Sequence, residues 1–120
     1  MPKLGSASVD QRGFPKVDFK DLYGADAYVS ASSIILDDVP GARENPGSSA
    51  LWLGVKSANP QIMARDAKRF GVETEETTGW VPFPVPDEVL LTTQMHLSRE
   101  QVEGLVSRLT EWLNNGSFED

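Results

Sequence analysis

The order of apolar and polar positions predicts strands in the first half of the chain and a long helix at its end. Between residues 16 and 20, Val17 and Phe19 alternate with charged side chains, the period of a strand with one buried face. Residues 21–24, Asp-Leu-Tyr-Gly, indicate a turn, and the alternation resumes over residues 25–31. These segments together predict a β-hairpin.

Two further stretches predict strands. Leu51, Leu53 and Val55 share one face of a strand while Trp52 lies on the other. This pattern fits either a central strand covered on both sides or a strand whose Trp52 face meets a second subunit. Residues 89–97 alternate in the same way and supply the last strand, which makes a sheet of about four strands.

Two helices follow from capping signals and apolar spacing. Asn59-Pro60 is typical of a helix start, so we expect a helix over residues 59–70 that ends at Gly71. Ser98 and Gln101 match a capping box, and Gly116 is suited to end the second helix. The apolar stripe of this second helix comprises Val102, Leu105, Val106, Leu109, Trp112 and Leu113.

The pattern as a whole predicts an α+β fold. It is an antiparallel sheet of about four strands, with the C-terminal helix packed on one face and the second helix inserted before the last strand. Residues 1–13 are small, polar and without periodicity, so we expect a flexible N-terminal tail followed by a single domain over residues 14–120. Residues 37–49 show neither period and predict a long surface loop.

Composition excludes several kinds of chemistry. The chain has 120 residues, no cysteine and one histidine, so disulfides, thiolate metal sites and multi-histidine metal sites are excluded. The net charge is −7, and residues 61–120 account for −6 of it, which argues against wrapping of nucleic acid. No stretch is long and apolar enough to span a bilayer, and no signal peptide is evident, so we expect a cytoplasmic protein without membrane contact.

His96 and the acidic pairs are the groups with the most familiar catalytic or metal chemistry. His96 is the one histidine of the chain, the residue type that most often acts as a general base, but neither a nucleophile nor an orienting carboxylate stands at an informative spacing. We expect a structural or interface histidine. The pairs Asp37-Asp38 and Asp87-Glu88 lack the spacing of a calcium loop, so we expect no metal and no cofactor.

The most unusual local feature is the segment from Gly79 to Pro86, in which three prolines alternate with other residues. Prolines stiffen this loop, and Trp80 and Phe83 provide large contact areas with few rotatable bonds. The two aromatic residues either fold inward over the sheet or form a recognition site. Such a site would gain a basic neighbour from one helix face that carries Arg65, Lys68 and Arg69.

Several motifs in order give the chain a family resemblance. They are Phe19-Lys20-Asp21-Leu22-Tyr23-Gly24, Ser32-Ser33, Leu51-Trp52-Leu53-Gly54-Val55, Gly79-Trp80-Val81-Pro82-Phe83-Pro84 and Met95-His96-Leu97-Ser98-Arg99-Glu100-Gln101-Val102. Over roughly residues 17–118 the chain resembles small uncharacterised proteins encoded by bacteriophages and prophages. The resemblance implies a phage accessory protein of unassigned activity, located in the cytoplasm of the host.

The sequence is compatible with three functions. The favoured one is a non-enzymatic, homodimeric binding protein that engages a host macromolecule, such as a component of antiviral defence. The second is a protein that binds or sequesters a nucleotide-like anion through Trp80, Phe83, Arg65, Lys68 and Arg69. The third is a hydrolase that uses His96.

Overall fold

The computed structural model describes residues 3–120, which form two compact units. We call Met1–Lys56 together with Gln94–Asp120 the sheet unit, and Ser57–Thr93 the insert unit. The fold class is α+β, as the sequence predicts: an antiparallel sheet, a short helix before the last strand of that sheet, and a C-terminal helix.

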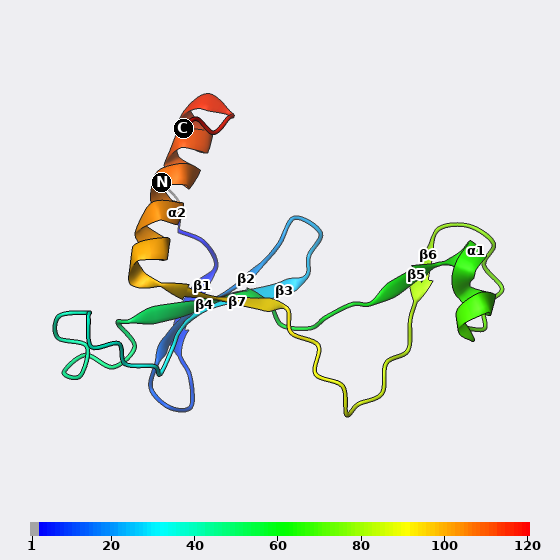
Figure 1. Ribbon diagram of the computed structural model, residues 1–120, viewed down its shortest axis with the longest axis horizontal. Helices are drawn as coiled ribbons and strands as arrows, with labels where there is room; N and C mark the ends of the chain where they lie inside the picture. Colours follow the sequence, from blue (N-terminus) through cyan, green and yellow to red (C-terminus); the bar gives the residue numbers. More distant parts are fainter. Residues whose placement is uncertain (1–2) are drawn as a thin grey trace. The chain divides into compact units, whose positions relative to one another are not determined.

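The sheet unit contains one antiparallel sheet of five strands, ordered β1-β2-β3-β4-β7 (Figure 1). Its strands are β1 (Ser6–Val9), β2 (Pro15–Lys20), β3 (Asp26–Ala31), β4 (Ala50–Val55) and β7 (Gln94–Ser98). The predicted hairpin is confirmed as β2 and β3, with Val17 opposite Val29. Asp21 closes its turn, because the side-chain carboxylate accepts hydrogen bonds from the N–H groups of Tyr23 and Ala25.

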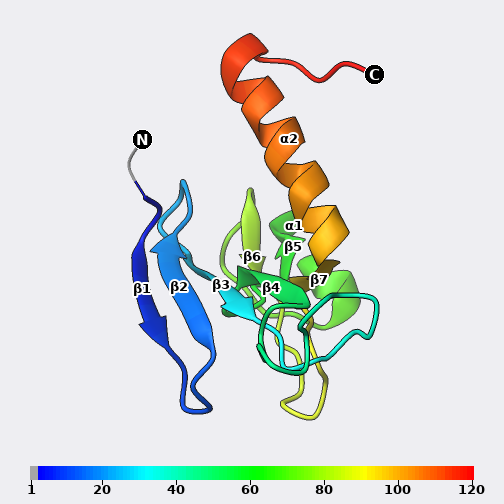
Figure 2. The ribbon, with the colours of Figure 1, turned by 90° about the vertical axis from the view of Figure 1, so that its left-hand side faces the viewer.

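Two strand predictions differ from the structure. The segment expected to be a flexible tail contributes β1, which pairs with β2 and is visible beside it in Figure 2. The turn between them is held by the carboxylate of Asp10, which accepts from the N–H groups of Arg12 and Phe14. In addition, β7 begins only at Gln94, so residues 89–93 are not part of the strand despite their alternation.

Strand alternation separates the sheet into two chemically different faces. Residues opposite each other across the ladder share a face, so the register assigns every strand residue. On one face every strand residue is apolar: Ala7, Val9, Pro15, Val17, Phe19, Ala27, Val29, Ala31, Leu51, Leu53, Val55, Met95 and Leu97. The opposite face carries Trp52 and His96 among mainly polar and charged residues.

The buried residues of the described chain are small. Among residues 3–120 the buried hydrophobic residues are six alanines and Val81, and none of the large side chains of the apolar sheet face is fully buried. Ala42 is buried within residues 37–49, which form turns without a helix or strand, as expected. The described part of the sheet unit therefore lacks a core of large apolar side chains.

The C-terminal helix α2 (Arg99–Asn115) is capped as predicted. The Ser98 hydroxyl accepts from the N–H of Gln101 at 3.1 Å, and the Gln101 side chain accepts from the N–H of Ser98 at 2.9 Å. Gly116 ends the helix with a φ of 70°. No side chain of α2 is buried, and no neighbour lies close to the position that a Cβ on Gly104 would occupy. Its contact with the sheet involves β4 and β7.

The insert unit is a two-stranded ribbon with a short helix. It comprises β5 (Gln61–Met63), α1 (Ala64–Ala67), the 3₁₀ turn η1 (Lys68–Phe70) and β6 (Trp80–Pro82). The helix predicted over residues 59–70 was therefore too long, because its first part pairs with β6 instead. Its end is confirmed: Gly71 has a φ of 77°, and the N–H of Val72 donates to the carbonyl of Ala67.

Within residues 3–120 no helix has both the length and the apolar character needed to cross a membrane.

Replacing the capping serine tests the junction between β7 and α2. Ser98→Ala removes the acceptor for the Gln101 N–H, so we expect a loss of about 1 kcal/mol in the free energy of unfolding. Urea titration followed by circular dichroism at 222 nm measures it. Ser107→Ala, on the exposed surface of the same helix, is the control. An unchanged midpoint for Ser98→Ala would contradict this role of the cap.

The ion pairs of Asp18 predict a dependence of stability on pH. Hydrogen bonds from Lys56 at 2.8 Å and Lys16 at 2.9 Å lower the pKa of Asp18 below the 3.8 of a free aspartate. A carboxylate with a lowered pKa stabilises the fold above the unfolded pKa, and this stabilisation is lost as the pH falls below about 4.

Asp18→Asn should therefore lower the urea midpoint at pH 7 and have a smaller effect at pH 3. Asp38→Asn, in an exposed turn, serves as the control. An equal loss for Asp18→Asn at both pH values would show that the charge of Asp18 is not the cause.

Candidate functional site

Of the two aromatic residues that the sequence suggests for a recognition site, Trp80 is the more exposed. It lies on β6 opposite Met63 of β5, and 63% of its surface is exposed. The next residue, Val81, is buried and packs against Ala64 and Ala67 of α1. Successive strand residues point to opposite faces, so Trp80 lies on the face of the ribbon away from α1.

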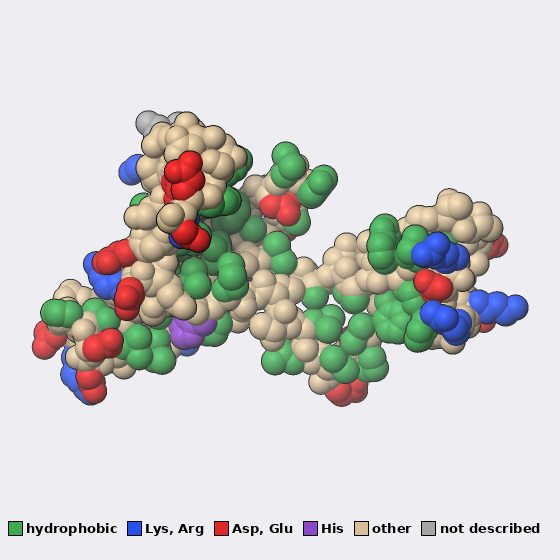
Figure 3. All heavy atoms as spheres, turned by 45° about the horizontal axis from the view of Figure 1, so that its top comes forward, with side chains coloured by type: hydrophobic (Ala, Val, Ile, Leu, Met, Phe, Trp, Pro, Cys, Tyr) green, Lys and Arg blue, Asp and Glu red, His purple; other side chains and the backbone are tan. Residues whose placement is uncertain are grey.

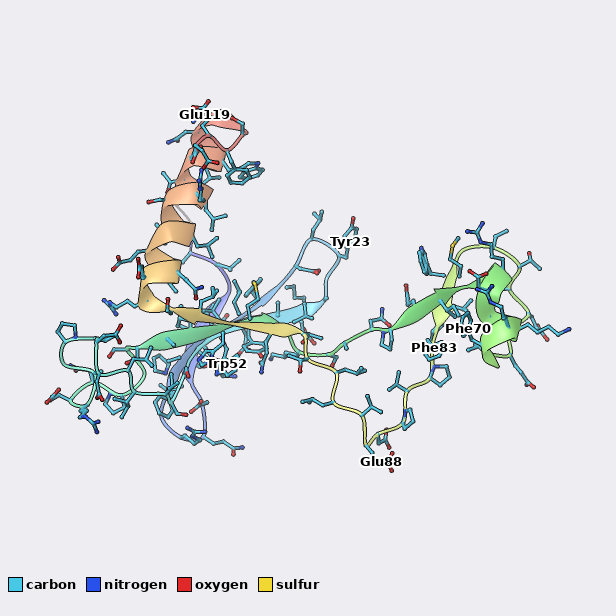
Figure 4. All side chains as sticks on the ribbon, viewed as in Figure 1. Tyr23, Trp52, Phe70, Phe83, Glu88 and Glu119 are labelled. Carbon is cyan, nitrogen blue, oxygen red and sulfur yellow. The ribbon has the colours of Figure 1, made fainter. Side chains whose placement is uncertain are left out.

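Phe83 follows β6 directly and has a different environment. Its N–H donates to the carbonyl of Pro60 at 3.0 Å, which extends the pairing of the ribbon by one residue. Its side chain is half-buried, and Figure 4 shows it within the insert unit together with Phe70. The two aromatic residues of the proline-rich loop thus differ, since Trp80 is exposed and Phe83 is partly covered.

The predicted basic residues cluster around one carboxylate. Arg65, Lys68 and Arg69 are all exposed, and the guanidinium groups of Arg65 and Arg69 lie 3.9 and 3.6 Å from Asp66. Figure 3 shows these cationic side chains grouped on the insert unit around an acidic one. An anion that binds here would have to compete with Asp66 for both arginines.

The structure brings the three cations together, but it does not combine them with Trp80 in one cavity. A hollow of about 400 Å³ beside them is lined by Lys68, Gly71, Val72, Glu73 and Thr74. Its lining contains one cation and one carboxylate and neither Trp80 nor Phe83. Trp80 lies on the other face of the ribbon, so an aromatic ring and the basic side chains do not enclose a common ligand in this arrangement.

His96 belongs to the polar face of the sheet, where it stacks on Trp52. The two rings are parallel within 7° and their centroids lie 3.8 Å apart. Figure 4 shows Trp52 on the side of the sheet away from α2. The Nε2 atom of His96 is 2.8 Å from the hydroxyl of Ser32, which directly follows β3. This arrangement fixes the orientation of the histidine ring.

Ser32 is the partner of His96 that sequence reasoning missed. The two residues are 64 positions apart and meet only because β3, β4 and β7 pair in order, which no local pattern indicates. A serine hydroxyl next to a histidine is the arrangement of an activated nucleophile. However, Ser32 is only 3% exposed and its oxygen also accepts from the N–H of Ile34. A substrate could not reach it without rearrangement of the residues that cover Ser32.

The acidic pairs Asp37-Asp38 and Asp87-Glu88 do not form a cation site. Within residues 3–120, no group of three or more histidine, aspartate or glutamate side chains could hold a metal ion. Asp37 instead forms an ion pair with Arg43 at 2.9 Å.

A second surface, which the sequence did not identify, is the uncovered apolar side of the sheet unit. We call the apolar sheet face and the apolar stripe of α2 together the apolar corner. The two surfaces join at a hollow of about 230 Å³ to which Leu51 of β4 and Val102 of α2 both contribute. Figure 3 shows hydrophobic side chains gathered beside α2. A second hollow of about 260 Å³ lies over Val17, Val29 and Leu51.

Comparison of the chain with models of protein families, with curated proteins and with solved structures finds no match.

The contacts of His96 with Trp52 and Ser32 predict a contribution of this histidine to stability. His96→Ala removes the aromatic stack and the partner of a buried hydroxyl, so we expect a loss of about 1–3 kcal/mol in the free energy of unfolding. Urea titration of the purified variant measures it. Lys20→Ala, an exposed residue of the same face, is the control. A loss no larger than that of the control would contradict a structural role for His96.

Proposed function

We propose that this chain is a non-enzymatic accessory binding protein of the bacteriophage type that engages a macromolecule of the host. In this proposal the insert unit carries the contact surface, the partner is met in the host cytoplasm, and the consequence of binding is inhibition of a component of antiviral defence. The resemblance stated above supports the origin and the consequence. The contact surface is argued from the insert unit itself.

The observation that carries the contact surface is the exposure of Trp80 on a well-defined platform. The ribbon is held by pairing of β5 with β6 and by the packing of Val81 on α1, so Trp80 is presented by a strand and not by a loose loop. Tryptophan contributes disproportionately to binding energy in protein interfaces. An exposed tryptophan on a small unit is therefore suited to anchor a partner.

The surroundings of Trp80 suit a large partner better than a small ligand. Phe70 is also more than half exposed, and the cations Arg65, Lys68 and Arg69 lie on the outer surface of α1 and η1. These groups are spread over both faces of the ribbon, and an extended macromolecular surface can contact them together. The anion-binding alternative has less support, because Asp66 already forms ion pairs with Arg65 and Arg69 and the hollow beside Lys68 is lined by neither Trp80 nor Phe83.

A comparison of two variants tests the proposal. The tagged full chain, Trp80→Ala and Tyr23→Ala are used as baits in isotope-labelled bacterial lysate, and the affinity for a recovered partner is then measured by calorimetry. Tyr23 is a matched control because it is 92% exposed in the hairpin turn of the sheet unit. We expect a partner that binds the wild type and Tyr23→Ala equally and binds Trp80→Ala about 30-fold more weakly, as for a hot-spot residue.

Two outcomes would contradict the proposal. One is that no partner is enriched by the wild-type chain, and the other is a partner whose affinity does not change in Trp80→Ala. A stabilisation of about 2.7 kcal/mol by a nucleotide at 100 times its dissociation constant would favour the anion-binding alternative instead.

A further inference from the structure

The apolar corner presents two surfaces that proteins of this class normally bury. The sheet face carries no charged or hydrogen-bonding side chain at any strand position, yet Val9 is 65% and Met95 is 54% exposed. On α2, Leu109 is 48% and Trp112 is 50% exposed. In α+β proteins an apolar sheet face and an apolar helix stripe are covered by packing on each other.

The connection between β7 and α2 prevents this packing within one chain. Ser98 is both the last residue of β7 and the N-cap of α2, so no linker is available to turn the helix back over the sheet. Figure 1 shows α2 rising from the end of β7. Only its first turns reach the sheet, through Arg99, Val102 and Glu103 at the hollow beside Leu51. The stripe from Val106 onward has no partner there.

The uncovered area is sufficient for a stable dimer. Burial of a large aliphatic side chain removes about 100 Å² from water, and an aromatic one about 150–250 Å². With Val106, Leu109, Trp112 and Leu113 each about half exposed, α2 offers roughly 250 Å² of apolar area, and the sheet face offers about as much. A standard interface buries about 800 Å² on each partner, of which about 450 Å² is apolar.

We propose that a second copy of this chain covers the apolar corner, with α2 of each copy lying across the apolar sheet face of the other. A two-fold axis brings the same surface of both copies together, so a single interface covers both sheet faces and both helices. The hollow over Val17, Val29 and Leu51 is the position at which Trp112 of the other copy would anchor.

This interface is distinct from the two surfaces considered earlier. It uses the face of β4 opposite to Trp52, whose ring is already stacked on His96, and it does not include the insert unit. The dimer and the binding of a host partner through Trp80 can therefore succeed or fail independently. Each copy carries a net charge of −7, so repulsion between copies should weaken the dimer at low salt and less so at high salt.

The mass of the full chain in solution tests the proposal. Sedimentation velocity from 1 to 200 µM should show twice the chain mass of 13.1 kDa at the higher concentrations. Leu109→Glu should weaken the dimer at least tenfold and leave the circular dichroism of the monomer intact, because Leu109 is not buried within the chain. Ser107→Glu adds the same charge on the opposite side of α2 and should leave the dimer unchanged.

Cross-linking identifies what covers the corner. A photoreactive amino acid replaces Leu109 in a nitrogen-15-labelled chain, which is mixed with unlabelled chain. We expect cross-links from the labelled chain to β2 or β3 peptides of the unlabelled one. A chain that stays monomeric, a dimer insensitive to Leu109→Glu, or cross-links within one chain to residues 57–93 would each overturn the proposal.

Discussion

The direct junction between β7 and α2 is the constraint on which the rest of the sheet unit depends. Ser98 ends the strand and caps the helix, and its capping box with Gln101 fixes the direction in which the helix begins. A loop of a few residues at this point would allow α2 to lie on its own sheet. Without one, the helix leaves the sheet after its first turns, and the apolar face and the apolar stripe both remain open.

This constraint explains why the buried residues of the chain are so small. Alternation places most apolar strand residues of the sheet on one face, but a single layer can bury only alanines and partly cover the larger residues. The polar face is stabilised differently, by the stack of Trp52 on His96 and the ion pairs of Asp18. In the proposed dimer, the second copy supplies the second layer for the sheet. The insert unit has its own small core around Val81.

Sequence patterns were reliable wherever the determining interactions are local. The hairpin turn at Asp21, the faces of β4 and both caps of α2 depend on residues a few positions apart, and all were predictable. The strand β1 was missed because it contributes backbone pairing with few large apolar residues. Asn59-Pro60 suggested a helix start, but pairing with β6 overrides that preference. The contact of Ser32 with His96 and the uncovered apolar corner depend on the order of strands, which no local pattern contains.

Hydrogen exchange of the α2 backbone across a dilution series tests whether a second copy of the chain covers this helix. An isolated helix of 17 residues is marginally stable in water, and α2 buries no side chain within its own chain, so strong protection of its amides must come from association. If a second copy covers α2, the protection of α2 falls as the protein is diluted through the range in which its mass changes from dimer to monomer. Protection that is strong and independent of concentration would show that the chain covers α2 by itself and would contradict the proposed dimer.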